Sequence, residues 1–140
     1  MHNLYLRTLV DRAITKSKKI VSAQRASIQK SARKWLNKGP ANTHVYVARL
    51  NGKIVHVGIT KNDILLRQLQ HRVAMPDIFL AQITKTALTR NQARAIEQAL
   101  INGGGKNGNK LKNRIDSIRS GRDILPGALE WATDWLKNNI

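Results

Sequence analysis

The stretch that decides the fold is THVYVARLNGKIVHVGIT, residues 43–60. Two runs rich in valine and isoleucine flank the dipeptide Asn51-Gly52. β-Branched residues favour strands, and Asn-Gly is a strong signal for a tight hairpin turn because both residues tolerate positive φ. The stretch therefore predicts an antiparallel β-hairpin.

A helix and a further strand are predicted after the hairpin. Asn62 is a candidate N-cap for a helix with an apolar side, and Pro76 ends that helix. The run 78–83 is short and apolar and is followed by a threonine-rich segment, which favours a third strand.

Two more helices complete the predicted order of elements. Thr89 and Gln92 have the spacing of a capping box, which opens a helix that closes at glycines 103–105. A last helix follows Pro126. The sequence thus predicts an α+β fold in which helices flank a small three-stranded antiparallel sheet.

The first forty residues have a different character. They carry ten lysines and arginines against the single acid Asp11. Apolar residues recur three and four apart over 6–14 and 28–36, which predicts two amphipathic helices, and Gly39 and Pro40 stop the second. We therefore expect a basic helical extension over residues 1–40 and a second domain over residues 41–140.

Composition narrows the function. The chain of 140 residues is 41% hydrophobic and 24% charged, and its formal net charge of +17 predicts acidic partners. It has no cysteine, which excludes disulfides, a thiol nucleophile and a thiolate zinc site. No apolar run approaches the roughly 20 residues of a membrane-spanning helix, so stable membrane insertion is not expected.

An ordered set of residues between 43 and 118 resembles the GIY-YIG endonuclease superfamily. The family's Gly-Ile-Tyr and Tyr-Ile-Gly motifs correspond to His44-Val45-Tyr46 and His56-Val57-Gly58, and its arginine and histidine, one helical turn apart, to Arg67 and His71. Its metal-binding glutamate corresponds to Glu97 and its late asparagine to Asn113. Two positions depart from the pattern, since His44 replaces a glycine and His56 replaces a tyrosine.

The resemblance implies a GIY-YIG-like fold and hydrolysis of a phosphodiester bond, in DNA or RNA. Tyr46 would be the general base, assisted by His56, and Arg67 and His71 would hold the phosphate. Glu97 would bind Mg²⁺ or Mn²⁺, and Asn113 would help to position the site. The expected nucleic-acid contacts are Lys53, Lys61, Arg72, Lys106, Lys110, Lys112 and Arg114.

The residues also allow structural roles. Tyr46 could be a packing residue of the strand, and Arg67 with His71 could form a solvated helix face. Glu97 could pair with Arg94, and Asn113 could cap a short helix.

A common active site would fix the register of the hairpin. A two-residue turn would place Tyr46 opposite Val57 and so on the other face from His56. A three-residue loop with Gly52 in the left-handed region would bring Tyr46 and His56 onto one face. The expected cross-strand pairs are then Tyr46 with His56, Ala48 with Ile54, and His44 with Gly58.

The module also resembles nuclease domains at the C-terminal tips of bacterial polymorphic toxins, including contact-dependent growth-inhibition systems. That resemblance implies a larger carrier protein, delivery into the cytoplasm of a target cell, and a cognate immunity protein that we expect to be acidic. Two alternatives remain open. One is a non-catalytic DNA- or RNA-binding module, for which the charge suffices, and the other is a membrane-active effector.

Overall fold

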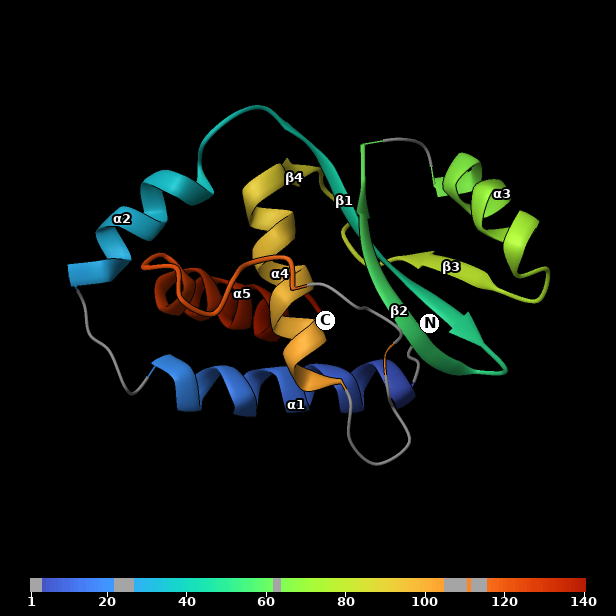
Figure 1. The fold of residues 1–140 in the computed structure, drawn as a ribbon, viewed down its shortest axis with the longest axis horizontal. Coiled ribbons are helices and arrows are strands. Elements are labelled where there is room, and N and C mark those ends of the chain that lie inside the picture. The colour runs from blue at the N-terminus through green and yellow to red at the C-terminus, as the bar shows by residue number, and fades with distance from the viewer. Residues whose placement is uncertain (1–3, 22–26, 62–63, 105–110, 112–115) are drawn as a thin grey trace.

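The computed structural model describes residues 4–21, 27–61, 64–104, 111 and 116–140 (Figure 1). Its elements are α1 (Leu4–Val21), α2 (Ser27–Leu36), β1 (Ala41–Leu50), β2 (Lys53–Thr60), α3 (Ile64–Ala74), β3 (Phe79–Gln82), β4 (Leu88–Thr89), α4 (Arg90–Gly103) and α5 (Leu125–Asn139). No helix among the described residues combines the length and apolar character needed to cross a bilayer.

The strands form a small antiparallel sheet flanked by helices, which confirms the predicted α+β class. Strand β1 lies between β2 and β3, and the short strand β4 pairs with the beginning of β1. The sequence analysis missed β4 because a two-residue strand directly before a helix cap is too short to show alternation.

The hairpin corrects the predicted register. Asn51 and Gly52 have φ values of 53° and 81°, the combination that a two-residue type I′ turn requires, so the expected three-residue loop is absent. Leu50 pairs with Lys53, and the register then shifts by one residue at Val55, a β-bulge. The physical reason is that Asn-Gly adopts the turn without strain, so the extra residue is accommodated inside β2 instead.

The bulge sets the pairs along the rest of the hairpin. Tyr46 lies opposite Gly58, Ala48 opposite His56, and His44 opposite Thr60, each displaced by two residues on β2 from the predicted partner. A shift of two residues preserves the face of every side chain, because side chains alternate with period two. Tyr46 and His56 therefore share one face of the sheet, as expected, although they are diagonal and not direct neighbours.

The other face of the hairpin contributes to the hydrophobic core. Val45, Val47 and Val57 are fully buried and belong to one cluster with residues of α1, α4 and α5. Figure 1 shows α4 crossing between the sheet and α5, so this helix joins the two halves of the molecule.

The two predicted basic helices are present and pack on that same core. Leu9, Val10 and Ala13 of α1 are fully buried in it. Gly103 at the end of α4 approaches the α1 backbone so closely that a Cβ would collide with Leu9 and Ala13. Residues on both sides of position 40 thus share one hydrophobic cluster, while the division into two domains stays a prediction.

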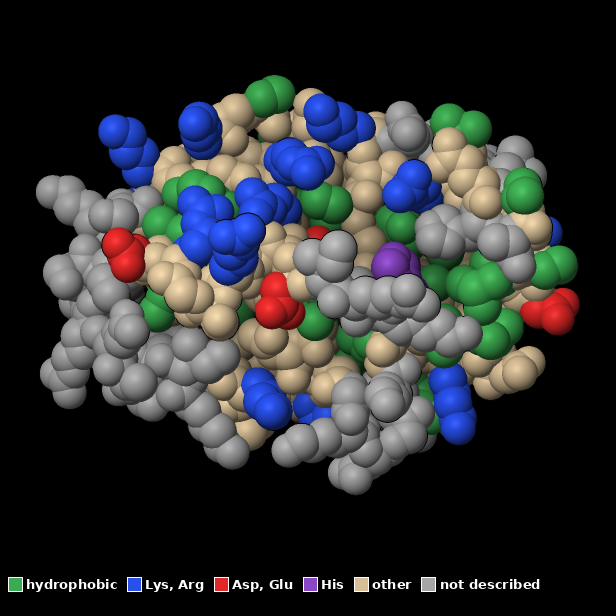
Figure 2. All heavy atoms as spheres, in the orientation of Figure 1, with side chains coloured by type: hydrophobic (Ala, Val, Ile, Leu, Met, Phe, Trp, Pro, Cys, Tyr) green, Lys and Arg blue, Asp and Glu red, His purple; other side chains and the backbone are tan. Residues whose placement is uncertain are grey.

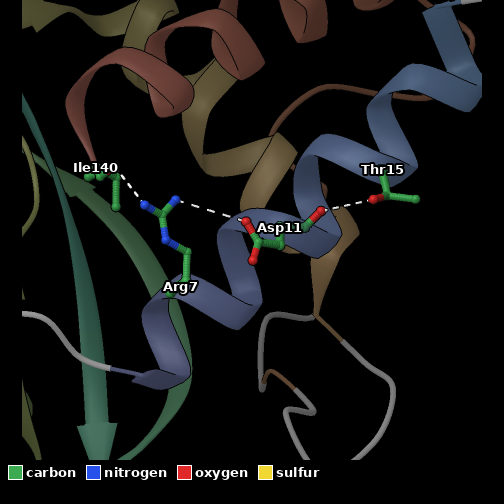
Figure 3. A network of polar contacts seen from close by, with 4 residues as sticks. All are labelled: Arg7, Asp11, Thr15 and Ile140. Carbon is green, nitrogen blue, oxygen red and sulfur yellow. Dashed lines mark hydrogen bonds and ion pairs between the residues drawn. The ribbon is translucent and has the colours of Figure 1, made fainter.

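Polar contacts tie the exposed side of α1 to the end of the chain (Figure 3). Arg7 donates a hydrogen bond of 3.3 Å to the oxygen of Ile140 and lies 3.9 Å from the Asp11 carboxylate. The Thr15 hydroxyl donates to the backbone oxygen of Asp11 at 3.0 Å. Because the Arg7–Asp11 pair is exposed, its contribution to the free energy of unfolding is below about 1 kcal/mol.

Helix α4 begins as the sequence predicts. The Thr89 hydroxyl accepts from the Gln92 backbone N–H at 3.1 Å, and the Gln92 side chain accepts from the Thr89 N–H at 3.0 Å. Further bonds attach this end to α2, because Asn91 donates to the Trp35 carbonyl at 2.9 Å. The beginning of α4 is therefore held firmly between α2 and the sheet.

Candidate active site and nucleic-acid interface

Tyr46 points away from the main core. It is 1% exposed, lies on the face of β1 opposite Val45 and Val47, and does not belong to their cluster. A Cβ added to Gly58, its cross-strand neighbour, would collide with the ring and the hydroxyl of Tyr46. The phenol therefore rests directly on the Gly58 backbone, and only glycine leaves room for it.

His56 lies beside this phenol. The ring centroids of Tyr46 and His56 are 6.2 Å apart and the planes are tilted by 45°. His56 is half-buried, and the register places it on the face shared by Tyr46 and Gly58. His44, on the same face, has a structural role: its Nδ1 lies 2.8 Å from the Thr84 hydroxyl, which also accepts from the Val45 N–H.

Arg67 reaches the phenol from α3. Its Nε donates to the Tyr46 hydroxyl oxygen at 3.5 Å, a long and weak hydrogen bond, and another guanidinium nitrogen donates to Gln70 at 3.0 Å. Gln68 anchors α3 to β3, donating to the Ile78 carbonyl at 2.7 Å and accepting from the Leu80 N–H at 2.6 Å. These bonds anchor the helix from which Arg67 reaches the phenol.

A surface hollow of about 240 Å³ lies beside Arg67. It is lined by Thr43, Ile59, Thr60, Lys61, Arg67 and Arg90. Its three charged side chains are all cationic, and two of its other residues carry hydroxyl groups. This is the chemistry that binds a phosphate group.

Glu97 stands apart from that hollow. It follows Arg90 by seven residues on α4, about 10 Å along the helix axis, and is not among the described residues that line the hollow. Burial raises the pKa of the Glu97 carboxyl, while a hydrogen bond from Ser117 and the positive charges of Arg94 and Arg90 oppose this shift. The structure thus brings Tyr46, His56 and Arg67 together and leaves Glu97 apart from them, farther along α4.

A larger groove of about 550 Å³ lies next to the hollow. Its residues are Trp35, Lys38, Gly39, Pro40, Asn42, Lys61, Arg90, Asn91, Arg94 and Arg122. We call it the basic groove. Lys61 and Arg90 line both the hollow and the basic groove, so the two are continuous. Figure 2 shows lysine and arginine side chains gathered on this part of the molecule, over α2, the start of β1 and the segment before α5.

The other predicted site residues are placed as follows. His71 belongs to α3, but its side chain is outside the described set, as are Asn113, Lys106, Lys110, Lys112 and Arg114. Lys53 is exposed at the hairpin turn, and Arg72 lies over the Phe79 ring with its Cζ 5.0 Å from the centroid. Of the predicted nucleic-acid contacts among the described residues, Lys61 lines both cavities.

Sequence reasoning missed most of the basic groove. Trp35 lies in the predicted amphipathic helix over 28–36 and Lys38 among the basic residues of the first forty, and nothing in the sequence indicates that α2 meets α4. The sequence did contain a signal for Arg90 and Arg94. They precede Glu97 by seven and three residues, so all three lie on one face of α4.

The chain offers a divalent metal one well-placed carboxylate. No group of three or more His, Asp or Glu side chains converges within the described part of the chain. Glu97 therefore fits an Mg²⁺ that keeps most of its waters and takes further oxygens from substrate phosphate, and it does not form an all-protein cage. The positive charges of the neighbouring Arg90 and Arg94 oppose the binding of a bare cation. A metal ion would therefore bind beside Glu97 together with an anionic ligand.

Comparison of the chain with protein families, with curated proteins and with solved structures finds no match. The functional argument therefore rests on the residues and their geometry.

Proposed function

We propose that this protein is a metal-dependent endonuclease that hydrolyses phosphodiester bonds of nucleic acid. The observation that carries the proposal is the contact between Arg67 and the Tyr46 hydroxyl at the edge of a hollow whose charged residues are all cationic. This arrangement puts an oxygen capable of proton transfer beside a site suited to phosphate.

The cationic residues of the hollow would bind the phosphate. Arg67, Arg90 and Lys61 would hold the scissile phosphate and stabilise the charge that develops on it during attack. The planar guanidinium of Arg67 is suited to two parallel hydrogen bonds with phosphate oxygens.

Tyr46 would act as the general base for the attacking water. As the phenolate, the Tyr46 oxygen would accept the proton of the water that bonds to phosphorus, while the bond from phosphorus to the leaving sugar oxygen breaks and that oxygen would take a proton from solvent. Tyr46 is 1% exposed, and Arg67 contacts both the phenol and the hollow. A phosphate that draws Arg67 outward would therefore also uncover the hydroxyl. His56, 6.2 Å away between ring centroids, would assist.

Glu97 would hold the metal ion. When bound, Mg²⁺ would supply positive charge to phosphate oxygens. Burial raises the pKa of the Glu97 carboxyl, and the hydrogen bond from Ser117 and the charges of Arg94 and Arg90 oppose that shift, so a bound metal ion would have to displace the proton that burial favours.

The basic surface also supports the proposed biological setting, a toxic effector domain carried by a larger protein into the cytoplasm of a target bacterium. A chain with net charge +17 favours fast association with an acidic immunity protein.

The test is a cleavage assay on purified protein. Fluorescently labelled DNA and RNA are incubated with Mg²⁺, with Mn²⁺ and with a chelator, and Arg67→Ala purified in parallel excludes a contaminating nuclease. We expect cleavage only with metal and only by the unsubstituted chain. Full activity in chelator would contradict the metal mechanism, and absence of cleavage on every substrate would contradict the nuclease.

The second candidate is a DNA- or RNA-binding module without catalysis. The continuity of the basic groove with the hollow favours it as much as it favours the nuclease, because cationic surfaces bind phosphate in either case. The same assay separates the two, since binding without cleavage identifies the module.

A further inference from the structure

The basic groove is assembled from four separate parts of the chain. The end of α2 supplies Trp35 and Lys38, the start of α4 supplies Arg90 and Arg94, and the segment before α5 supplies Arg122. Asn42 and Lys61 line the side of the groove that lies next to the sheet. A surface built from parts so distant in sequence requires that α2 be folded onto the rest.

Trp35 is the centre of this assembly. The guanidinium carbons of Arg94 and Arg122 lie 5.4 Å and 5.5 Å from its ring centroid, within cation–π range. Arg94 also donates two hydrogen bonds to the Ser117 carbonyl, at 2.7 Å and 3.2 Å. The indole and the Ser117 carbonyl together hold Arg94 in the groove wall.

The charges of the groove repel one another. All five charged residues that line it are cationic: Lys38, Lys61, Arg90, Arg94 and Arg122. The pKa of Arg94 is lowered by burial and by the positive charges of Arg122 and Arg90. An anionic ligand would relieve this repulsion, so the groove is suited to several phosphates at once.

We propose that the basic groove binds the phosphate backbone of an unpaired nucleic-acid strand that leads out of the hollow at Arg67. We place the path of the strand along Lys61 and Arg90, because these two residues line both cavities. The connection of the strand to the hollow rests on the proposed nuclease. A volume of about 550 Å³ suits a short piece of single strand, whereas a double helix about 20 Å wide would remain outside. The exposed guanidinium of Arg122, layered on Trp35, offers a surface on which a base can stack.

The test compares two double variants that remove equal charge. Lys38→Gln/Arg122→Gln changes the basic groove, and Lys16→Gln/Lys137→Gln changes exposed lysines that do not line it. Binding of a labelled 12-nucleotide single strand, and of the matching duplex, is measured by anisotropy in chelator, where metal-dependent cleavage is suppressed.

The groove variant should bind the single strand about 25-fold more weakly at 0.1 M salt, because each lost phosphate contact costs about fivefold. Its slope of log affinity against log salt should decrease by about 1.4. The control variant should change affinity less than threefold, and the duplex should bind the unsubstituted chain more weakly than the strand does.

Equal binding by the two variants, or duplex binding as tight as strand binding, would overturn the proposal. Inorganic pyrophosphate that binds as tightly as the strand would also overturn it, in favour of a small-ligand site. If Arg122→Gln prevents folding, Lys38→Gln/Lys61→Gln tests the same groove through two exposed side chains. Strand binding as predicted, without cleavage in Mg²⁺, would refute the nuclease and leave this inference standing.

Discussion

The hollow beside Tyr46 and the basic groove differ in how the chain builds them. The residues around the phenol, Gly58, His56 and Arg67, come from the hairpin and the helix that follows it, and the hollow beside Arg67 adds Arg90 from α4. The groove gathers Trp35, Arg94 and Arg122 from three separate segments. In our account the region around the phenol performs the reaction, while the groove binds the strand.

The largest expected effect comes from Glu97, which lies farther along α4 than Arg90 and lines neither region. Glu97→Gln should lower the cleavage rate by about 10²- to 10³-fold, the effect of losing one electrostatic stabiliser of the transition state. Strand affinity should be unchanged, because the cations of the groove remain. Asp77→Asn, at an exposed acid, is the control and should cleave normally. A fully active Glu97→Gln would remove Glu97 from the mechanism.

The basic surface should also govern association with the proposed acidic immunity protein. Because long-range attraction between exposed charges is screened by salt, the association rate should fall at least tenfold between 0.05 M and 0.5 M salt. Stopped-flow fluorescence measures this rate. An association rate that is independent of salt would show that charge does not steer the encounter.

The close contact between Gly58 and Tyr46 predicts a loss of stability. Gly58→Ala forces a Cβ into the phenol and should lower the free energy of unfolding by about 1–3 kcal/mol. Gly121→Ala, where a Cβ meets nothing within 4 Å, should change it by less than about 0.5 kcal/mol. Urea denaturation of both variants provides the measurement, and equal stability would mean that the phenol does not rest on Gly58.

The hairpin also illustrates what sequence reasoning could and could not predict. Local signals were sufficient for β1, β2 and β3 and for the Thr89 cap, whereas the placement of Tyr46 and His56 on one face was predicted by requiring a common active site. The register was wrong, because the Asn51-Gly52 turn forms with two residues and Val55 is the extra one. A bulge inside a strand of β-branched residues leaves no pattern by which its position can be read.

The site could be predicted only in part, for a related reason. Arg67 was predicted from the resemblance to the GIY-YIG pattern, and the structure brings it to Tyr46. Trp35 and Arg122 could not be found, since their proximity depends on how α2 and the segment before α5 pack against α4. Contacts that arise from tertiary packing have no signature in local periodicity.

The smallest expected effect is a pH dependence of stability at Glu97. Burial raises the pKa of its carboxyl in the folded chain, so the folded state holds the proton more tightly than the unfolded state. This contribution to stability is present below the pKa of the unfolded chain and is lost as pH rises through the folded value. The difference in free energy of unfolding between the unsubstituted chain and Glu97→Gln should therefore decrease between pH 4 and pH 7. Denaturation at several pH values checks the sign, and an increase would contradict it.

The most direct test of the central claim is single-turnover cleavage at increasing protein concentration. The experiment gives two quantities, the maximal cleavage rate and the protein concentration at which half of that rate is reached. Both are measured for the unsubstituted chain, for Arg67→Ala and for Lys38→Gln/Arg122→Gln. We predict that Arg67→Ala loses most of the maximal rate, and that the groove variant keeps that rate and needs about 25-fold more protein to reach half of it. A groove variant that loses the maximal rate, or an Arg67→Ala protein that keeps it and only binds more weakly, would contradict the division between chemistry and binding.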